Sequence, residues 1–349
     1  MNNFIKGKQI MDMLSQGTIP PRVPFAPTIY EHAAKLLNVT PSRLARDPDL
    51  IVRGQLAAYE MYGHDLISVG VDIYNVEAEA MGCPVRYYED NTLPSVNGVL
   101  IKDLSDLENL ELPDPAKDGR MPVMIEACEA LKAEIGDEVY VSAAIVGPFT
   151  LAAILRGYED FLTDLMFEEE FAAAQLKFAA EVGICYANAL VKKGIGVAIN
   201  ESWITPPLLS PNLLRDRVLE VEKYTISNIK KAGAASVTLI SGGNTTPIAE
   251  YLVQTGTSLL MADSQTDQKA YKLLCEKQNI NLRASIDSKI VETGNEAEME
   301  SAAKKVIENC AANGRFIFGC GVVSLDTEPT NVVKLKHIVE KLNPYKAGA

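Results

Sequence analysis

The sequence predicts an α/β fold, a (β/α)8 TIM barrel that spans residues 1–349 as a single domain. Three observations predict this fold: eight short apolar, β-branched runs, a stretch of helical periodicity after each run, and no GxGxxG motif after any of them. Strands that alternate with helices pair in parallel, and eight of them close a barrel. The alternative is an open, doubly wound sheet, which the strand number and the missing glycine motif disfavour.

The predicted strands are spread along the whole chain. They lie at 22–27, 65–71, 138–145, 195–202, 235–241, 257–263, 281–287 and 315–321. Several of the intervening helices end in glycine just before the next strand, namely at Gly194, Gly233, Gly256 and Gly314. Glycine suits the left-handed backbone position that follows a helix, so these residues support the predicted boundaries.

The stretch from about 73 to 137 is too long for a simple connection between a strand and a helix. It contains CPVRYYED, SVNGVLIKDL and the proline-rich ELPDPAKDGRMP, followed by a helical segment. We predict an inserted excursion after the second strand, with a short hairpin and a helix, that lies over the barrel mouth. Long structured insertions of this kind are usually functional.

Composition excludes several functional classes. Hydrophobic residues make up 47% and charged residues 23%, as in ordinary globular proteins rather than disordered or fibrous ones. The net charge of −13, with scattered Lys and Arg, disfavours a nucleic-acid partner and an anionic membrane surface. There is no apolar run of spanning length and no signal-peptide core, and the six cysteines are far apart. We therefore expect a soluble, cytoplasmic enzyme with reduced thiols.

Four acids stand at the ends of different predicted strands. Asp72 follows the second strand, Glu201 ends the fourth, Asp263 the sixth and Asp287 the seventh. The active site of a TIM barrel is built at these strand ends, where gathered carboxylates raise one another's pKa or hold a cation. We predict that the four acids are catalytic. The alternative for each is that it caps the next helix, which explains one such acid more easily than four.

Other residues at the predicted rim are candidates for substrate or metal binding. The substrate-binding candidates are His32, Tyr74, Asn200, Trp203, Ser241 and Asn244. Cys320 lies between Gly319 and Gly321 after the last strand, and these glycines let the backbone approach a ligand closely. We therefore treat Cys320 as the candidate metal ligand. The alternatives are that the aromatic residues simply pack and that Cys320 is a small buried apolar residue.

Several segments resemble the uroporphyrinogen decarboxylase superfamily, and most closely its branch of cobalamin-dependent methyltransferases, which includes the methylcobamide:coenzyme M methyltransferases. These segments are VEAEAMGCPV, GRMPVMIEACEALKAEIGDEV, VGPFTLAA, CYANALVKKG, GNTTPI and GCGVVSLDTEPTN. The resemblance covers nearly the whole chain. It implies a (β/α)8 barrel with its active site at the carboxyl ends of the strands.

The decarboxylase branch of this family can be compared position by position. Its arginine-rich N-terminal motif corresponds here to PFAPTIYEH, which has no arginine. Its essential aspartate corresponds to Asp72, its tyrosine to Ile154 and its C-terminal histidine to Cys320. The many carboxylates of a porphyrinogen require cationic partners, so the resemblance implies that uroporphyrinogen is a poor substrate.

The methyltransferase branch holds zinc through a His-x-Cys-Gly-Asn motif and a later cysteine. The later cysteine corresponds to Cys320, but the other two ligands fall on Ile240 and Gly242, which cannot bind a metal. Two alternatives remain. Either zinc is rebuilt from Cys320 with carboxylates such as Glu201, Asp263 or Asp287, or the methyl donor needs no thiolate activation. Methylated amines and aryl methyl ethers are such donors, and an acidic rim with Trp203 suits a methylammonium group.

The resemblance implies a corrinoid-dependent methyltransferase that exchanges a methyl group between a small molecule and the cobalt of a separate corrinoid protein. The chain shows no additional cobalamin domain, so we expect the partner protein to carry the corrinoid and to dock near the excursion at 73–137. The alternatives are a uroporphyrinogen decarboxylase-like lyase and a zinc-less, non-catalytic binding barrel.

Overall fold

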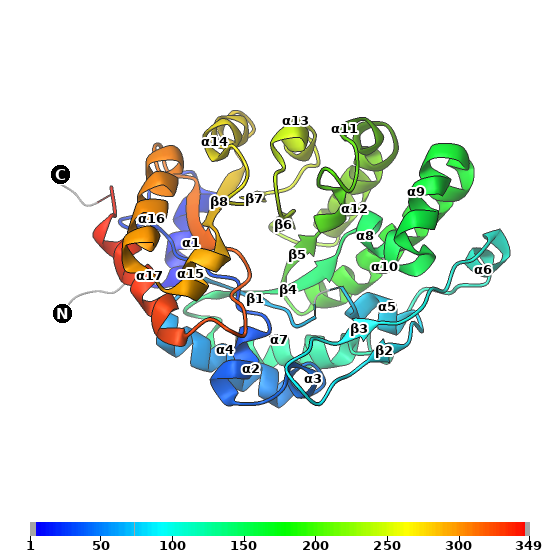
Figure 1. The fold of residues 1–349 in the computed structure, drawn as a ribbon, viewed down its shortest axis with the longest axis horizontal. Coiled ribbons are helices and arrows are strands. Elements are labelled where there is room, and N and C mark those ends of the chain that lie inside the picture. Colours follow the sequence, from blue (N-terminus) through cyan, green and yellow to red (C-terminus); the bar gives the residue numbers. More distant parts are fainter. Residues whose placement is uncertain (1–4, 73, 346–349) are drawn as a thin grey trace.

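Seven parallel strands form one curled sheet in the computed structural model, which describes residues 5–72 and 74–345 (Figure 1). The strand order β1–β4–β5–β6–β7–β8–β9 follows the sequence, as in a TIM-like barrel. The strands are β1 (Leu66–Val69), β4 (Tyr140–Val146), β5 (Gly196–Asn200), β6 (Val237–Ile240), β7 (Leu259–Ala262), β8 (Asn281–Ile286) and β9 (Phe316–Cys320). Each of them lies within or overlaps one of the predicted runs.

The first predicted strand, at 22–27, is not a continuous strand. It makes two isolated parallel bridges to the end of the sheet, Phe25 with Phe318 and Thr28 with Val322. Its other side reaches the opposite edge, where the Phe25 carbonyl accepts a hydrogen bond of 2.8 Å from the Asp65 amide just before β1. The physical reason for the interruption is proline: Pro24 and Pro27 have no N–H to donate to a ladder. The segment still lies between the two edge strands.

Helices surround the curled sheet (Figure 1). The α-helices are α1 (Gly7–Ser15), α2 (His32–Leu37), α3 (Pro41–Leu44), α4 (Pro48–Tyr62), α5 (Val76–Ala80), α6 (Leu104–Glu108), α7 (Met121–Ile135), α8 (Pro148–Arg156), α9 (Tyr158–Phe167), α10 (Glu169–Lys192), α11 (Pro211–Leu213), α12 (Leu219–Lys231), α13 (Ala249–Leu252), α14 (Gln268–Lys277), α15 (Ser288–Thr293), α16 (Glu296–Cys310) and α17 (Pro329–Lys341). Short 3-10 helices η1 (Ser202–Ile204) and η3 (Thr246–Ile248) and the π-helix η2 (Leu214–Val218) complete the set.

Between β1 and β4 the chain makes a two-stranded antiparallel pair, β2 (Val85–Arg86) with β3 (Ser95–Val96), and then α6 and α7. Figure 1 shows this cyan part of the chain along the lower right, with α6 at the outer edge. This part of the chain lies near the carboxyl ends of the strands, and its residues 93–96 and Gly98 line the cavity described below.

The inside of the curled sheet is closed at one end by an apolar cluster. Leu14 of α1 packs with Ala26, Leu259 and Ile317. Leu259 is the first residue of β7 and Ile317 the second of β9, so α1 covers the amino ends of the strands. The carboxyl ends are left for a binding site, which is the arrangement expected of this fold.

Among the described residues, none of the helices combines the length and the apolar character that crossing a membrane requires.

An ion pair between the half-buried Arg22 and the buried Asp65 joins the segment at 22–27 to β1. The Asp65 carboxylate accepts both hydrogen bonds of the Arg22 guanidinium, each at 2.6 Å, and a third at 2.9 Å from the Phe25 amide. Only 1% of the Asp65 side chain is exposed. This carboxylate therefore fixes the segment that completes the ring of strands.

We predict that Asp65→Ala lowers the free energy of unfolding by about 1–3 kcal/mol, because it leaves the buried Phe25 amide without a partner and the half-buried Arg22 guanidinium without its counter-charge. Denaturant unfolding followed by circular dichroism measures the change. Asp137→Ala, which removes an exposed acid next to β4, is the matched control and should change stability by less than about 0.5 kcal/mol. Equal effects of the two substitutions would contradict the proposed closing role.

Candidate active site

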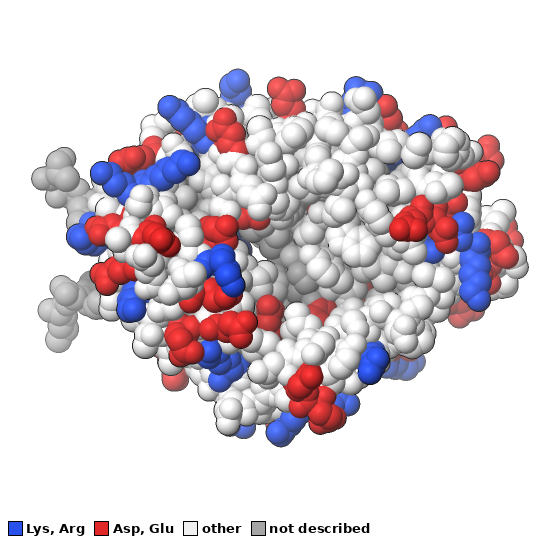
Figure 2. Space-filling view, viewed as in Figure 1, with Lys and Arg blue, Asp and Glu red and all other residues white. Residues whose placement is uncertain are grey.

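A cavity of about 600 Å³ opens at the carboxyl ends of the strands. Figure 2 shows a deep hollow near the centre of this face, bordered largely by uncharged atoms, while most Lys, Arg, Asp and Glu lie farther out. The cavity is lined by Tyr30, Glu31, Val71, Asp72, Tyr74, Asn75, Leu93, Pro94, Ser95, Val96, Gly98, Ala153, Ile154, Gly157, Tyr158, Trp203 and Val322. The wall is built from the residues that follow the 22–27 segment and β1, from the 73–137 stretch including β3, and from α8, α9 and η1.

Three aromatic rings form one wall of the cavity. The Trp203 ring lies 5.6 Å from that of Tyr158, edge to face, and 6.5 Å from that of Tyr74. The Tyr74 hydroxyl donates to Ser202 Oγ at 2.8 Å and the Tyr158 hydroxyl donates to the Leu208 carbonyl at 2.5 Å. These bonds hold the rings in place, so the wall is preformed. Fixed aromatic faces suit methyl groups and organic cations.

Asp72 lines the same cavity but is paired within the protein. Arg120, from the start of α7, donates to both of its carboxylate oxygens at 2.7 Å, and Asn75 donates to Oδ2 at 2.9 Å. The same guanidinium also binds Glu79 at 2.5 Å. Both Asp72 and Arg120 are buried. A carboxylate held this way presents little free charge to a ligand, so its effect on the cavity is mainly to position Arg120 and Asn75.

Glu31 is an acid of the cavity wall that sequence reasoning missed. None of the ion pairs found among the described residues involves it, and burial raises the pKa of its carboxyl, with the nearby Asp72 charge adding to the effect. An acid with a raised pKa in a cavity wall is a typical functional group. The available signal was its position, one residue before His32 in the segment that follows the first strand.

Glu201 turns away from the cavity and caps a helix. Its carboxyl accepts hydrogen bonds from the Phe149 amide at 3.1 Å, the Thr150 amide at 2.8 Å and the Thr150 hydroxyl at 2.5 Å, at the first turn of α8. A Cβ at position 147 would collide with this carboxyl, which explains the glycine there. Glu201 is fully buried and is not among the cavity residues. These contacts are those of a helix cap, which was the alternative to a catalytic role for each of the four predicted acids.

A second buried acid, Glu222 of α12, accompanies Glu201. Both are fully buried, and the Glu222 carboxyl lies within hydrogen-bond reach of the Glu201 carboxyl. Burial raises the pKa of Glu201 to about 7 and raises that of Glu222 well above its usual range, with the Glu201 charge as a further cause. Two carboxyls buried next to each other cannot both ionise readily, so the pair retains a proton at neutral pH.

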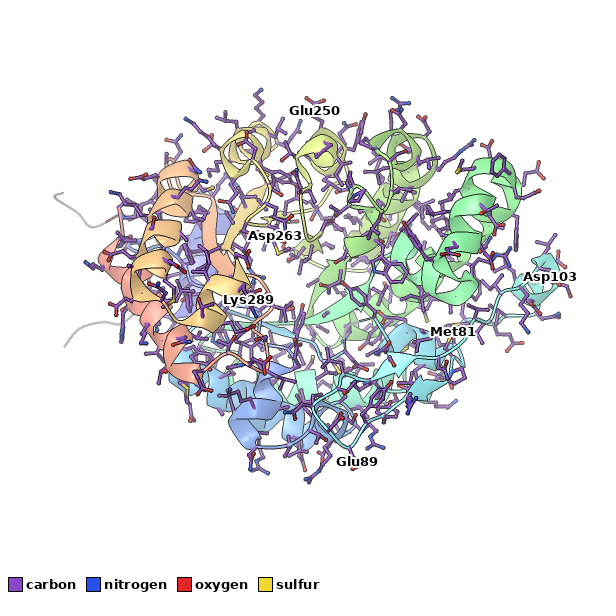
Figure 3. All side chains as sticks on the ribbon, viewed as in Figure 1. Met81, Glu89, Asp103, Glu250, Asp263 and Lys289 are labelled. Atoms are coloured by element: carbon purple, nitrogen blue, oxygen red, sulfur yellow. The ribbon has the colours of Figure 1, made fainter. Side chains whose placement is uncertain are left out.

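The other two predicted acids, Asp263 and Asp287, accept hydrogen bonds from backbone amides. Asp263 accepts hydrogen bonds from the Gly243 amide at 2.8 Å and the Ser264 amide at 2.6 Å, which joins the loops after β6 and β7. Figure 3 shows it beside the central opening of the ring of strands. Asp287 is exposed and caps α15, where its Oδ1 accepts from the Lys289 amide at 2.9 Å. A catalytic role for either acid stays a prediction, and both carboxylates already have backbone partners.

The remaining predicted substrate-binding residues are dispersed. His32 is fully buried, with Nδ1 2.9 Å from the Ser324 carbonyl and Nε2 2.8 Å from the Tyr62 hydroxyl, so both ring nitrogens are occupied within the protein. Asn200 and Ser241 are buried at the ends of β5 and β6. Asn244 is exposed and lines a neighbouring cavity of about 550 Å³ together with the glycines before it.

The predicted zinc site has no counterpart in residues 5–72 and 74–345. No three His, Cys, Asp or Glu side chains in these ranges lie close enough to hold a metal ion together. Cys320 is fully buried, and burial raises the pKa of its thiol to about 11, so it stays protonated at neutral pH. The predicted alternative in which Cys320 and rim carboxylates rebuild a zinc site is therefore not found among these residues, because the carboxyls of Glu201, Asp263 and Asp287 accept hydrogen bonds from backbone amides instead.

Comparisons with known proteins agree with this architecture. The model of the uroporphyrinogen decarboxylase (URO-D) family matches residues 6–342. Methylcobamide:CoM methyltransferase MtbA of Methanosarcina mazei is 27% identical over 292 residues, or 83% of each chain. Uroporphyrinogen decarboxylase of Geobacter sp. is 24% identical over 294 residues, or 82% of each chain. Among solved structures, a methyltransferase from Methanosarcina mazei superimposes with a TM-score of 0.86 at 23% identity, covering 97% of this chain and 99% of that one.

The buried carboxyl pair generates a prediction on pH dependence. The pKa of Glu201 rises from 4.5 in the unfolded chain to about 7 in the folded protein. The folded state therefore binds more protons than the unfolded state across this window, and stability falls as pH rises through it. We expect Glu222→Gln to flatten this dependence, so that the variant is more stable than the parent at pH 8 and loses that advantage near pH 4.5.

Urea unfolding at a series of pH values measures this difference. Glu220→Gln is the matched control, because this acid lies on the same helix with 82% of its side chain exposed. Parallel curves for the parent and Glu222→Gln, separated by a constant amount, would show that the pair does not share a proton.

Proposed function

Because the chain belongs to the uroporphyrinogen decarboxylase (URO-D) family, we propose that it is a methyltransferase that exchanges a methyl group between a small methylated molecule and the cobalt of a corrinoid on a separate protein. Its methylcobamide:CoM methyltransferase relatives support this reaction class. We propose further that the whole chain forms one barrel domain whose substrate cavity is the one between Asp72 and Trp203.

The composition of the cavity wall is the observation that carries the proposal. It combines the rings of Tyr74, Tyr158 and Trp203 with the Glu31 carboxyl, and none of the described residues that line it is Lys or Arg. The Arg120 guanidinium, which binds Asp72 of this wall, is engaged by Asp72 and Glu79. A porphyrinogen carries many carboxylates, and no Lys or Arg side chain of the described lining is there to pair with them, whereas a methylated ammonium group would find aromatic faces and the Glu31 carboxyl.

The corrinoid is assigned to a partner protein, and this chain's residues fit the task of receiving it. Leu93 and Val322 line the cavity mouth and are exposed, which gives an apolar rim for a flat, largely apolar macrocycle to approach. When bound, the corrinoid supplies the cobalt that accepts or delivers the methyl group. The zinc of the coenzyme M enzymes does not fit, because Ile240 and Gly242 offer no donor atoms, and no step is derived through it.

The chain's own residues hold the donor and exclude water. Trp203 and Tyr158 contact the methylated nitrogen, and Glu31 lies in the same cavity to balance its positive charge. A bound cation favours the ionised form of Glu31, which opposes the effect of burial on its pKa. Because the hydroxyls of Tyr74 and Tyr158 are hydrogen-bonded and Trp203 packs between these two rings, the donor is held in one orientation, which is the contribution that positioning makes to group transfer.

We expect Trp203→Ala to raise the KM for a cationic donor about 2- to 30-fold, as the loss of a cation–π contact of about 0.5–2 kcal/mol implies. Trp203→Phe should retain most of the affinity. The assay follows methyl transfer to free reduced cobalamin by absorbance, with tetramethylammonium and trimethylammonium as donors. Tyr140→Phe, on the surface at the start of β4, is the control and should leave KM unchanged.

The same assay separates the alternatives. Glu31→Gln should raise KM for the ammonium donors and leave it unchanged for the neutral donor methoxybenzene. Faster turnover of methoxybenzene than of the ammonium donors would replace the amine by an aryl methyl ether as donor class. Turnover of uroporphyrinogen would overturn the proposal in favour of the lyase, and the absence of any turnover together with binding of the donors would favour a binding barrel.

A further inference from the structure

A buried guanidinium lies inside the curled sheet, apart from the aromatic wall. Arg283 is in the middle of β8 and is 5% exposed. Its neighbours Leu282 and Ala284 belong to the core that packs against the helices. Because successive side chains of a strand point to opposite faces, Arg283 points to the inside. A Cβ built on Gly319 of β9 would lie 2.6 Å from its Nε, which places that nitrogen directly against β9.

No carboxylate within the described structure pairs with Arg283. Its Nη2 donates to the Thr28 hydroxyl and, at 3.2 Å, to the Cys320 carbonyl, both of which are neutral. Its Nε has no hydrogen-bond partner among the described residues. The Asp263 charge acts on it from beyond ion-pair distance, and that carboxylate is engaged by two backbone amides. A buried charge without a counter-charge is strongly destabilising unless something else balances it.

Two hydroxyls near the guanidinium, those of Tyr30 and Ser285, are also buried, and Ser285 Oγ has no hydrogen-bond partner within the described residues. The Tyr30 hydroxyl lies close to the side chains of Ser68 and Asn200 and within the field of Arg283. Ser285 Oγ would lie 2.7 Å from the same Cβ at Gly319, so it shares the space beside Nε. The group is thus one cation with several hydroxyl donors and no carboxylate.

Tyr30 connects this group to the cavity, because it is also one of the residues that line the cavity. Tyr30 therefore belongs both to the cavity wall and to the surroundings of the guanidinium, and its hydroxyl is buried on the latter side. Oxygens with negative charge are the natural partners of a guanidinium and converging hydroxyls.

We propose that Arg283, Tyr30 and Ser285 form a binding site for the oxyanion group of a small ligand, a carboxylate, sulfonate or phosphate. The ligand supplies the negative charge that the barrel interior lacks. This inference goes beyond the proposed methyl transfer and does not depend on it, since it rests on the charge and the unpartnered donors alone.

The experiment measures thermal unfolding of the full chain in acetate, methanesulfonate or inorganic phosphate against chloride at equal ionic strength. For the parent protein we expect a saturable rise in Tm of roughly 2 °C when the oxyanion is about tenfold above its Kd. Titration calorimetry with the same three anions gives Kd directly, and their order identifies which oxyanion the site prefers. Arg283→Met should weaken the preferred anion at least tenfold and abolish the rise in Tm.

Arg43→Met, at an exposed arginine of α3, is the matched control and should keep the full effect. Gly319→Ala provides a second variant should Arg283→Met fold poorly, since its methyl group occupies the space beside Nε and Ser285 and should also weaken anion binding. An equal rise in Tm for the parent and both barrel variants would place the anion elsewhere. No rise for the parent with any of the three anions would show that ordered water alone satisfies these donors. Either result overturns the proposal.

Discussion

The Asp65 carboxylate is the contact on which the ring of strands depends. The segment around Phe25 cannot form a regular ladder because two prolines interrupt its donors, so the three hydrogen bonds that Asp65 accepts supplement its isolated backbone bridges. That segment leads directly to Thr28, Tyr30 and Glu31. Closing the ring therefore does more than complete a sheet: it brings one acid to the cavity wall and one hydroxyl to the buried guanidinium, both from a stretch with little secondary structure of its own.

The sequence predicted the strands well because their signal is local. Runs such as DLISVGV and RFIFGCG are apolar and β-branched, they are separated by helical periodicity, and they lie where β1 and β9 occur. The first run was the exception for an equally local reason: the prolines at 24 and 27 could have indicated a bridging segment rather than a strand. The antiparallel pair of β2 and β3 is only two residues long on each side, which is too short to leave a periodic pattern.

The candidate site was predicted less completely, since a strand end fixes where a residue lies but not what it binds. Asp72, Tyr74 and Trp203 line the cavity as their positions suggested. The partner that neutralises Asp72 is 48 residues farther along the chain, and no local pattern connects the two. Arg283 was the most informative missed residue. A single arginine in the otherwise buried run NLRASID is a visible signal, because a charge in that setting requires a partner.

The surroundings of Arg283 and those of the Glu201–Glu222 pair differ in the sign of the buried charge. The chain carries a net charge of −13, yet the Arg283 guanidinium inside the sheet has no paired carboxylate among the described residues, while the carboxyl of Glu201, at the start of α8, and that of Glu222, in α12, are buried together. An apolar side chain at position 283 would give the barrel equal or greater stability, since replacing a buried charge by well-packed apolar groups is often neutral or stabilising. Keeping the charge is costly in the empty protein and becomes favourable once a negative group sits beside it. The unpaired arginine is therefore best understood as one half of an interaction whose other half is brought by the ligand.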